Sequence, residues 1–178
     1  MGLDDFAVSR TIATPDGPFS VIATGDAVLA SGWTDDLGLL SGLIHPSLRE
    51  AGADRRGAAD GAALDRALAA VRAYYDGDLG VVGSVPVRQL GGAFMMRVWE
   101  VMRGITPGSP VSYGELAARA GKPSAARAAG SACSHNAAAL FVPCHRVIRA
   151  DGTTGAFAYG PGIKAALLAR ESGRAGIW

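Results

Sequence analysis

The sequence SYGELAARAGKPSAARAAGSACS, residues 112–134, contains two helical patterns separated by a short break. Ser112 is suited to cap a helix over residues 113–120, and Ser124 to cap a second helix over 125–134. The tripeptide 121–123, Gly-Lys-Pro, is a strong helix breaker. Helix, tight turn, helix is the pattern of a helix-turn-helix, but an ordinary helical hairpin has the same pattern and is commoner.

The second of these helices is unusually slim. It consists mainly of Ala, Gly and Ser, and Arg127 is the single long side chain in its first turns. A slim helix can approach another surface very closely. The pattern fits a narrow groove or a tight helix contact, and by itself does not choose between them.

Outward from this stretch, the sequence predicts an α/β fold in two domains, a small α/β domain over 1–90 and a mostly helical domain over 91–178, joined near Gly91-Gly92. Residues 38–61 are rich in Gly and Ala and give no clear assignment. The predicted elements are a β-hairpin over 9–24, a third strand over 27–33, a helix over 62–75 ended by Asp76-Gly77, a strand over 81–87 and a helix over 94–103.

The two halves of the chain carry opposite charge. Of 178 residues, 49% are hydrophobic and 19% charged, which is enough for a packed core. The first 90 residues hold 7 basic and 12 acidic side chains, net −5, whereas residues 91–178 hold 10 and 4, net +6. A polyanionic partner would therefore bind the second half.

The chain has only two cysteines, Cys133 and Cys144, too few for a secreted disulfide framework. No Cys-x2-Cys or His-x3-His pair is present, so we expect no metal. The chain has no apolar run of membrane-spanning length, and the start, residues 1–6, is acidic where a signal peptide would be basic. These features favour a cytoplasmic protein without a membrane partner.

The pentapeptide Pro-Cys-His-Arg-Val at 143–147 is the most specific motif in the chain. Together with Ser-Tyr-Gly-Glu-Leu-Ala at 112–117, Asn136 and Leu-Leu-Ala-Arg-Glu at 167–171, it closely resembles the O6-alkylguanine-DNA alkyltransferase family. The resemblance is looser in residues 1–90, where it implies a ribonuclease-H-like domain. It implies a monomer without a cofactor that moves an alkyl group, such as methyl, from O6-alkylguanine, and from O4-alkylthymine, onto its own Cys144.

The chemistry suits those residues. A thiolate is the best soft nucleophile that a protein has for attack at an alkyl carbon, and a free thiol needs a base to ionise it. The resemblance implies a relay from Cys144 through a bound water to His145 and Glu171, with Tyr113 donating to the departing guanine. Since the thioether product cannot be released, each molecule would react once.

The resemblance also implies the residues that contact DNA and substrate. Arg127 would fill the space left when the target nucleotide is flipped out of the duplex, with the slim helix in the minor groove. The implied DNA contacts are Lys122, Ser124, Ala126, Arg127 and Ala128. The implied substrate contacts are Asn136, which also ties the helix pair to the active-site turn, Val147, Phe157, Ala158 and Tyr159.

The loop over residues 155–162, which the resemblance identifies as the substrate loop, departs from the family pattern at three positions. We would expect tyrosine at Phe157, serine or glycine at Ala158 and glycine at Tyr159. Phe157 keeps a ring that can stack on guanine, and Ala158 keeps its backbone N–H. Tyr159 puts a bulky ring at the predicted pocket rim, where it would narrow access for large adducts or act as a lid.

Two other functions compete with alkyl transfer as interpretations of this sequence. The first is a non-catalytic or divergent DNA-binding protein that senses alkylation damage, against which the joint presence of Cys144, His145, Glu171 and Tyr113 argues. The second is a Cys–His hydrolase, which needs its histidine across a cleft rather than next along the chain. Cys133 is predicted to be a small core residue among alanines, and His45 and His135 to be surface residues.

Overall fold

The computed structural model describes residues 7–53 and 61–173. The acidic start at 1–6 and residues 54–60 of the unassigned segment therefore lie outside the described residues. The chain forms two compact units, one from the described part of Met1–Leu90 with Ala137–Phe141, the other from Gly91–Asn136 with Val142 onward. The mixed α/β content agrees with the expected fold class.

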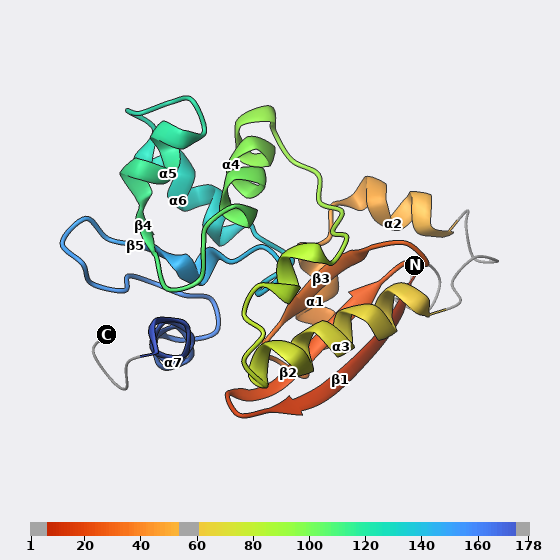
Figure 1. Ribbon diagram of the computed structural model, residues 1–178. Helices are drawn as coiled ribbons and strands as arrows, with labels where there is room; N and C mark the ends of the chain where they lie inside the picture. Colours follow the sequence, from red (N-terminus) through yellow and green to blue (C-terminus); the bar gives the residue numbers. More distant parts are fainter. Residues whose placement is uncertain (1–6, 54–60, 174–178) are drawn as a thin grey trace. The chain divides into compact units, whose positions relative to one another are not determined.

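A three-stranded antiparallel sheet forms the centre of the first unit (Figure 1). Strands β1 (Val8–Thr14) and β2 (Gly17–Ala23) make the predicted hairpin, with Gly17 at φ +113° in the tight turn. Strand β3 (Val28–Gly32) pairs with β2, so the third predicted strand is confirmed.

Helix α3 (Ala62–Tyr75) lies along the sheet (Figure 1) and buries the face on which its apolar residues recur. It ends at Asp76-Gly77 as predicted, with Gly77 at φ +110°. The segment that the sequence left unassigned contains α1 (Leu37–Leu43), capped by the Asp36 side chain, and α2 (Pro46–Ala53).

The predicted strand over 81–87 is wrong. Residues Val81–Ser84 form the 3-10 helix η2, and only Val87 makes an isolated bridge, to Val28. Val82 and Val85 are buried three residues apart, which is the spacing of a 3-10 turn and not of a strand. Pro86, which cannot donate to a ladder, further limits pairing.

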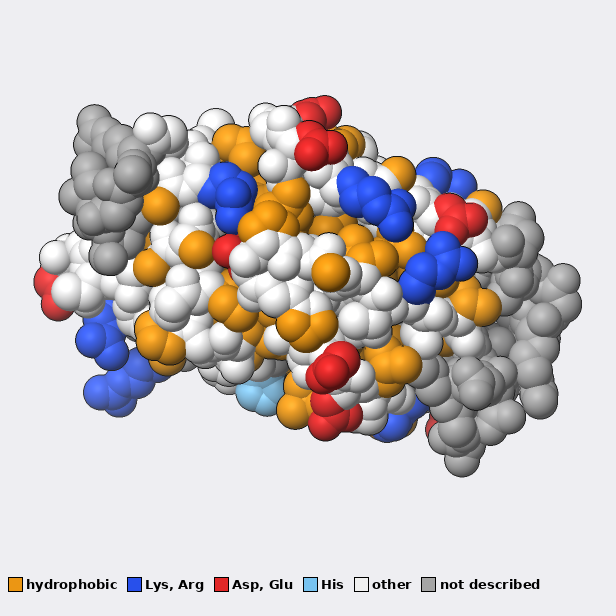
Figure 2. All heavy atoms as spheres, turned by 90° about the horizontal axis from the view of Figure 1, so that it is seen from below, with side chains coloured by type: hydrophobic (Ala, Val, Ile, Leu, Met, Phe, Trp, Pro, Cys, Tyr) orange, Lys and Arg blue, Asp and Glu red, His pale blue; other side chains and the backbone are white. Residues whose placement is uncertain are grey.

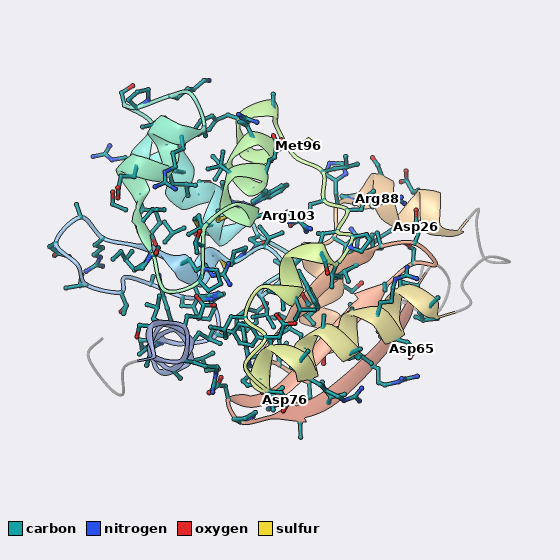
Figure 3. All side chains as sticks on the ribbon, in the orientation of Figure 1. Asp26, Asp65, Asp76, Arg88, Met96 and Arg103 are labelled. Carbon is teal, nitrogen blue, oxygen red and sulfur yellow. The ribbon has the colours of Figure 1, made fainter. Side chains whose placement is uncertain are left out.

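The segment Ala137–Phe141 belongs to the core of the first unit. It is buried throughout, and its backbone bonds to Ser31 of β3 on both sides: Ser31 N donates to Ala137 O at 2.8 Å, and Ala139 N to Ser31 O at 3.1 Å. The Phe141 ring meets Phe19 edge-on. On the surface of the same unit Arg88 pairs with Asp26 (Figure 3).

The second unit is mostly helical. Helices α4 (Ala93–Arg103), α5 (Tyr113–Arg119) and α6 (Ala126–Ser134) pack on one another (Figure 1), and Trp99 Nε1 of α4 donates to Ala132 O of α6 at 2.8 Å. The short strands β4 (Val111–Ser112) and β5 (Val147–Ile148) pair in parallel. The 3-10 turn η3 (Cys144–Arg146) precedes β5 and packs against α7 (Pro161–Ser172).

The helix caps agree with the sequence at one of two positions. Ser112 caps α5 in a capping box with Glu115, as predicted. Ser124 does not cap α6: the cap residue is Ala125, without a side-chain bond. Ala125 N donates to Lys122 O, so the turn after Gly121 runs one residue longer and the helix begins beyond reach of Ser124.

Charged side chains lie in separate groups on the face shown in Figure 2, where Lys and Arg alternate with Asp and Glu among hydrophobic atoms. Within residues 7–53 and 61–173, none of the helices combines the length and hydropathy of a bilayer-spanning segment.

Candidate active site

A cavity of about 270 Å³ opens in the second unit between α5, α6, the Cys144 turn and the loop before α7. It brings together six residues predicted for the site, from segments up to 46 residues apart. The complete lining is Tyr113, Gly130, Cys133, Ser134, Asn136, Cys144, Ala156, Phe157, Ala158 and Tyr159.

Cys144 begins the turn η3 and is partly exposed to the cavity. Asn136, which follows α6, donates from Nδ2 to Val142 O at 2.7 Å and also hydrogen-bonds the Cys144 side chain. Burial raises the pKa of the Cys144 thiol, and the Asn136 hydrogen bond and the Lys164 charge oppose the rise without cancelling it. The thiol therefore needs a base to become a nucleophile.

His145 and Arg146, the other two residues of this turn, form a buried cluster with Glu171 of α7. His145 Nε2 is 2.8 Å from Glu171 Oε1, and Arg146 binds both carboxylate oxygens, through Nε at 2.9 Å and a terminal nitrogen at 3.0 Å. The other terminal nitrogen of Arg146 donates to Ile105 O at 2.7 Å. The His145 and Glu171 side chains are fully buried, so this geometry is fixed by packing as well as by charge.

The hydrogen bond to Glu171 fixes the tautomer of His145. A carboxylate accepts, so Nε2 carries the proton and Nδ1 carries the lone pair. Burial lowers the pKa of His145 against the opposing pull of Glu171, so the imidazole is neutral. Nδ1 is buried and no described residue hydrogen-bonds it. It is a base next in sequence to the thiol.

Glu171 remains ionised despite its burial. Burial raises its pKa, but the hydrogen bonds from His145 and Arg146 and the charge of Arg146 outweigh that effect and hold the pKa at about 2. The loop before β4 approaches the same residue closely. Gly108, at φ +77°, leaves room where a Cβ would lie 2.8 Å from Glu171 O, so a larger residue there would displace the end of α7.

Tyr113 is held between two glycines. A Cβ on Gly130 of α6 would lie 3.8 Å from its ring, and one on Gly155 would lie 3.5 Å from its hydroxyl. Burial raises the pKa of Tyr113, with the Cys133 and Cys144 thiols adding to the rise and Arg149 opposing it. The hydroxyl therefore stays protonated, and Tyr113 lines the cavity.

Residues of the predicted substrate loop also line the cavity. The rings of Phe157 and Tyr159 meet edge-on with centroids 5.5 Å apart, and both line the cavity with Ala158 between them. Burial raises the pKa of Tyr159. The ring at the position where glycine was expected is thus part of the wall.

The residues predicted to contact DNA lie apart from the cavity lining, at the start of α6 and the turn before it. Arg127, Ala128, Ser124 and Lys122 are exposed, and Ala126 is half-buried. The Lys122 ammonium lies 5.1 Å from the centre of the Phe94 ring. Val147, predicted to contact substrate, is instead buried and does not line the cavity.

Cys133 is the clearest correction at the site. It was expected to be a core residue, but it is partly exposed and lines the same cavity as Cys144. Burial raises its pKa to about 12, so it stays a thiol at neutral pH. His45 and His135 are exposed as predicted.

Lys164 and Arg146 are the functional candidates that the sequence analysis missed. Lys164 is buried on α7, and the helical spacing of Lys164, Leu167, Leu168 and Glu171 puts them on one face. From this spacing the sequence could have predicted that Lys164 lies on the buried face of the helix. Among the described residues, no group of three or more His, Cys, Asp and Glu side chains could hold a metal ion.

Comparison with known proteins gives a consistent result. The family model "6-O-methylguanine DNA methyltransferase, DNA binding domain" matches residues 93–173. The methylated-DNA--protein-cysteine methyltransferase of Shigella flexneri is 36% identical over 165 residues, which are 92% of this chain and 95% of that protein. The chain belongs to this methyltransferase family.

Two further relatives extend the comparison. The bifunctional transcriptional activator/DNA repair enzyme Ada of Escherichia coli is 46% identical over 89 residues, half of this chain but only a quarter of that protein. The crystal structure of Mycobacterium tuberculosis OGT in complex with DNA has a TM-score of 0.70 and 30% identity, covering 95% of each chain. The methyltransferase resemblance thus extends through both units.

Proposed function

We propose that this protein repairs alkylated DNA by moving the alkyl group of O6-alkylguanine onto Cys144, once per molecule. The observation that carries the proposal is the buried His145–Glu171 pair next to Cys144, which itself lines the cavity, together with the His145 Nδ1 atom, which no described residue hydrogen-bonds. The names of the family relatives supply the substrate class.

The base works as a relay. His145 Nδ1 takes the thiol proton of Cys144 through a bound water, and the Glu171 carboxylate stabilises the imidazolium that forms. Arg146 holds the carboxylate in place with two hydrogen bonds and keeps it ionised. Since burial raises the pKa of the thiol, the relay is needed for attack at neutral pH.

The transfer is an in-line displacement at the alkyl carbon. The thiolate sulfur forms a bond to that carbon, the carbon–oxygen bond breaks, and its electron pair passes to guanine. Tyr113, protonated and facing the cavity, donates a proton or hydrogen bond to the departing base. The product is a thioether on Cys144, which has no neighbouring group able to expel it, so the reaction is stoichiometric.

The substrate loop would hold the guanine. Phe157 offers a ring for stacking, and the Ala158 N–H a donor for the guanine oxygen. Asn136 binds both the thiol and the carbonyl of Val142, so it couples the end of α6 to the reacting turn. We propose O4-alkylthymine as a second substrate, because its alkylated oxygen is chemically similar to that of O6-alkylguanine.

DNA would be bound through α5 and α6, acting as a helix-turn-helix with α6 in the minor groove. The exposed, almost bare start of α6 carries Arg127, which is long enough to fill the gap left by a flipped nucleotide. The crystal structure of M. tuberculosis OGT in complex with DNA supports DNA as the partner. We also propose that the first unit is a ribonuclease-H-like domain and that the protein is a monomer. Its two cysteines, too few for a disulfide framework, favour a cytoplasmic location.

The experiment is a titration with a duplex that contains one O6-methylguanine. We expect wild-type protein to remove one lesion per molecule and then stop. Cys144→Ser should remove none while still binding the duplex, because an alkoxide forms far less readily than a thiolate. Cys133→Ser is the matched control and should still remove lesions. Turnover well beyond one equivalent, or transfer by Cys144→Ser, would refute the proposal.

A further inference from the structure

Arg149 is an exposed cation close to the cavity, and the proposed DNA contacts do not include it. It follows β5 directly, at the start of a turn whose backbone is hydrogen-bonded. Arg149 N donates to Thr153 O at 2.9 Å, and Gly152 N donates to Arg149 O at 3.0 Å. Gly152, at φ +84°, allows the chain to turn this tightly. The side chain therefore extends from a fixed backbone position.

The Arg149 side chain lies beside the hydroxyl of Tyr113. Both approach Gly155, which has φ +73°: a Cβ there would lie 3.5 Å from Arg149 Cγ, 3.6 Å from Arg149 Nε and 3.5 Å from the Tyr113 hydroxyl. Tyr113 lines the cavity, whereas Arg149 is not among the lining residues. Arg149 is therefore at the rim, next to a residue that faces the bound base in the proposed reaction.

The guanidinium forms no ion pair with any residue that the structure describes. Asp151 is the nearest acid along the chain, but its Oδ1 accepts from Thr153 N at 3.0 Å and from Thr153 Oγ1 at 2.7 Å. The hydrogen bonds from Thr153 lower the pKa of Asp151, and the charge of Arg149 adds to that effect. Asp151 thus stabilises the turn, and the guanidinium is left available to an external anion.

The proposed reaction brings such an anion to the rim. A flipped base enters the cavity, but the sugar and the phosphates of its nucleotide stay outside. A guanidinium can bind a phosphate through two parallel hydrogen bonds, which fix its orientation as well as its position. The alternative is that Arg149 acts inward, on Tyr113, and the experiment below separates the two roles.

We propose that Arg149 binds a backbone phosphate of the flipped nucleotide and so holds its base in the cavity. The inference rests on the proposed function in that a nucleotide is flipped into this cavity. The role differs from that of Arg127, which would fill the gap left in the duplex. The Arg149 contact belongs to the extruded nucleotide itself, so it does not require a second strand.

The first test compares three substrates: an O6-methylguanine duplex, the same single strand and free O6-benzylguanine. Arg149→Ala should slow transfer from both DNA substrates roughly tenfold, because both carry the phosphate. The free base has none, and its reaction should be nearly unchanged. Arg127→Ala should slow transfer from the duplex alone. Arg149→Lys should restore most of the loss, and Arg97→Ala, at an exposed pair on α4, is the control for loss of one charge.

The second test neutralises one phosphate on either side of the lesion with a methylphosphonate. It uses the Cys144→Ser variant, which should bind without reacting. At one of the two positions the modification should weaken binding roughly tenfold when Arg149 is present and little in the double variant with Arg149→Ala. Equal weakening in both proteins at both positions would overturn the proposal.

Two further outcomes separate this inference from its alternatives. If Arg149→Ala slows the free base as much as DNA, the guanidinium acts on Tyr113, and the phosphate role is overturned. If wild type accepts no alkyl group from DNA although the methylphosphonate effect still depends on Arg149, the phosphate contact is supported and the proposed function is refuted.

Discussion

The reacting turn and the start of α6 hold their charges in opposite ways. Behind Cys144, the side chains of His145, Arg146 and Glu171 are buried and bonded to one another. At the start of α6, Arg127 is exposed, and so is Lys122 in the preceding turn. In the proposed function the chemistry is therefore built in advance, whereas the DNA contacts would form only when DNA supplies the opposite charge.

The largest effect should come from breaking the buried cluster. Glu171→Gln keeps the shape but leaves Arg146 buried without its counter-charge, which should reduce the free energy of unfolding by about 3–5 kcal/mol. It should also slow alkyl transfer, since the imidazolium loses its carboxylate. Denaturant unfolding and single-turnover rates measure the two effects. A wild-type stability would contradict the assignment of the cluster as a unit.

The same cluster predicts a pH dependence of stability. The pKa of Glu171 is about 2 in the folded protein and about 4.3 in an unfolded chain, so its stabilisation is complete above the unfolded value. It is lost as the pH falls from about 4.3 toward about 2, and amounts to about 3 kcal/mol. Glu171→Gln should lose less stability than wild type over that pH window. Equal losses would show that other carboxylates dominate acid unfolding.

Arg127 should give an intermediate effect that depends on the substrate. Arg127→Ala should slow repair of duplex DNA more than reaction with free O6-benzylguanine, because the free base needs no flipping. Arg97→Ala, at an exposed position on α4 to which no DNA contact is assigned, controls for loss of one surface charge. Binding by wild type should weaken steeply with salt. An equal loss with both substrates would place the role of Arg127 in the cavity and not in DNA engagement.

The smallest effect concerns the cavity wall. Tyr159→Gly removes a ring that packs on Phe157 and should raise the ratio of benzyl to methyl transfer rates, since a methyl group needs little room. Phe157 is left in place, so stacking on guanine is retained. Second-order rate constants for both adducts give the ratio. A fall in the ratio would mean that the Tyr159 ring binds the benzyl group, and no change would mean that it does not limit access.

The sequence could predict the features that depend on local pattern or on the specific motif. The hairpin, α3, α4 and the Ser112 cap follow from alternation, helical periodicity and capping chemistry. The motif brought Cys144, His145 and Glu171 to attention, and their contacts are consistent with it.

What could not be predicted depends on which surfaces meet. Cys133 is partly exposed because the face of α6 that carries it lines the cavity. The alanine-rich sequence of this helix does not indicate which of its faces does so. Lys164 shares a helical face with Leu167, Leu168 and Glu171, but the pattern does not reveal its two carbonyl partners, Val147 of β5 and Ala156 in the loop before α7. Val81–Ser84 failed as a strand because β-branched residues alone do not separate a strand from a 3-10 turn.

The most direct test of the account is the position of the alkyl group after reaction. Both thiols line the cavity, but only Cys144 lies beside the His145 relay, while the pKa of Cys133 is raised to about 12. After reaction with a duplex carrying isotopically labelled O6-methylguanine, peptide mapping should find one label per molecule, on Cys144. A label on Cys133, or an unmodified protein with the lesion gone, would contradict it.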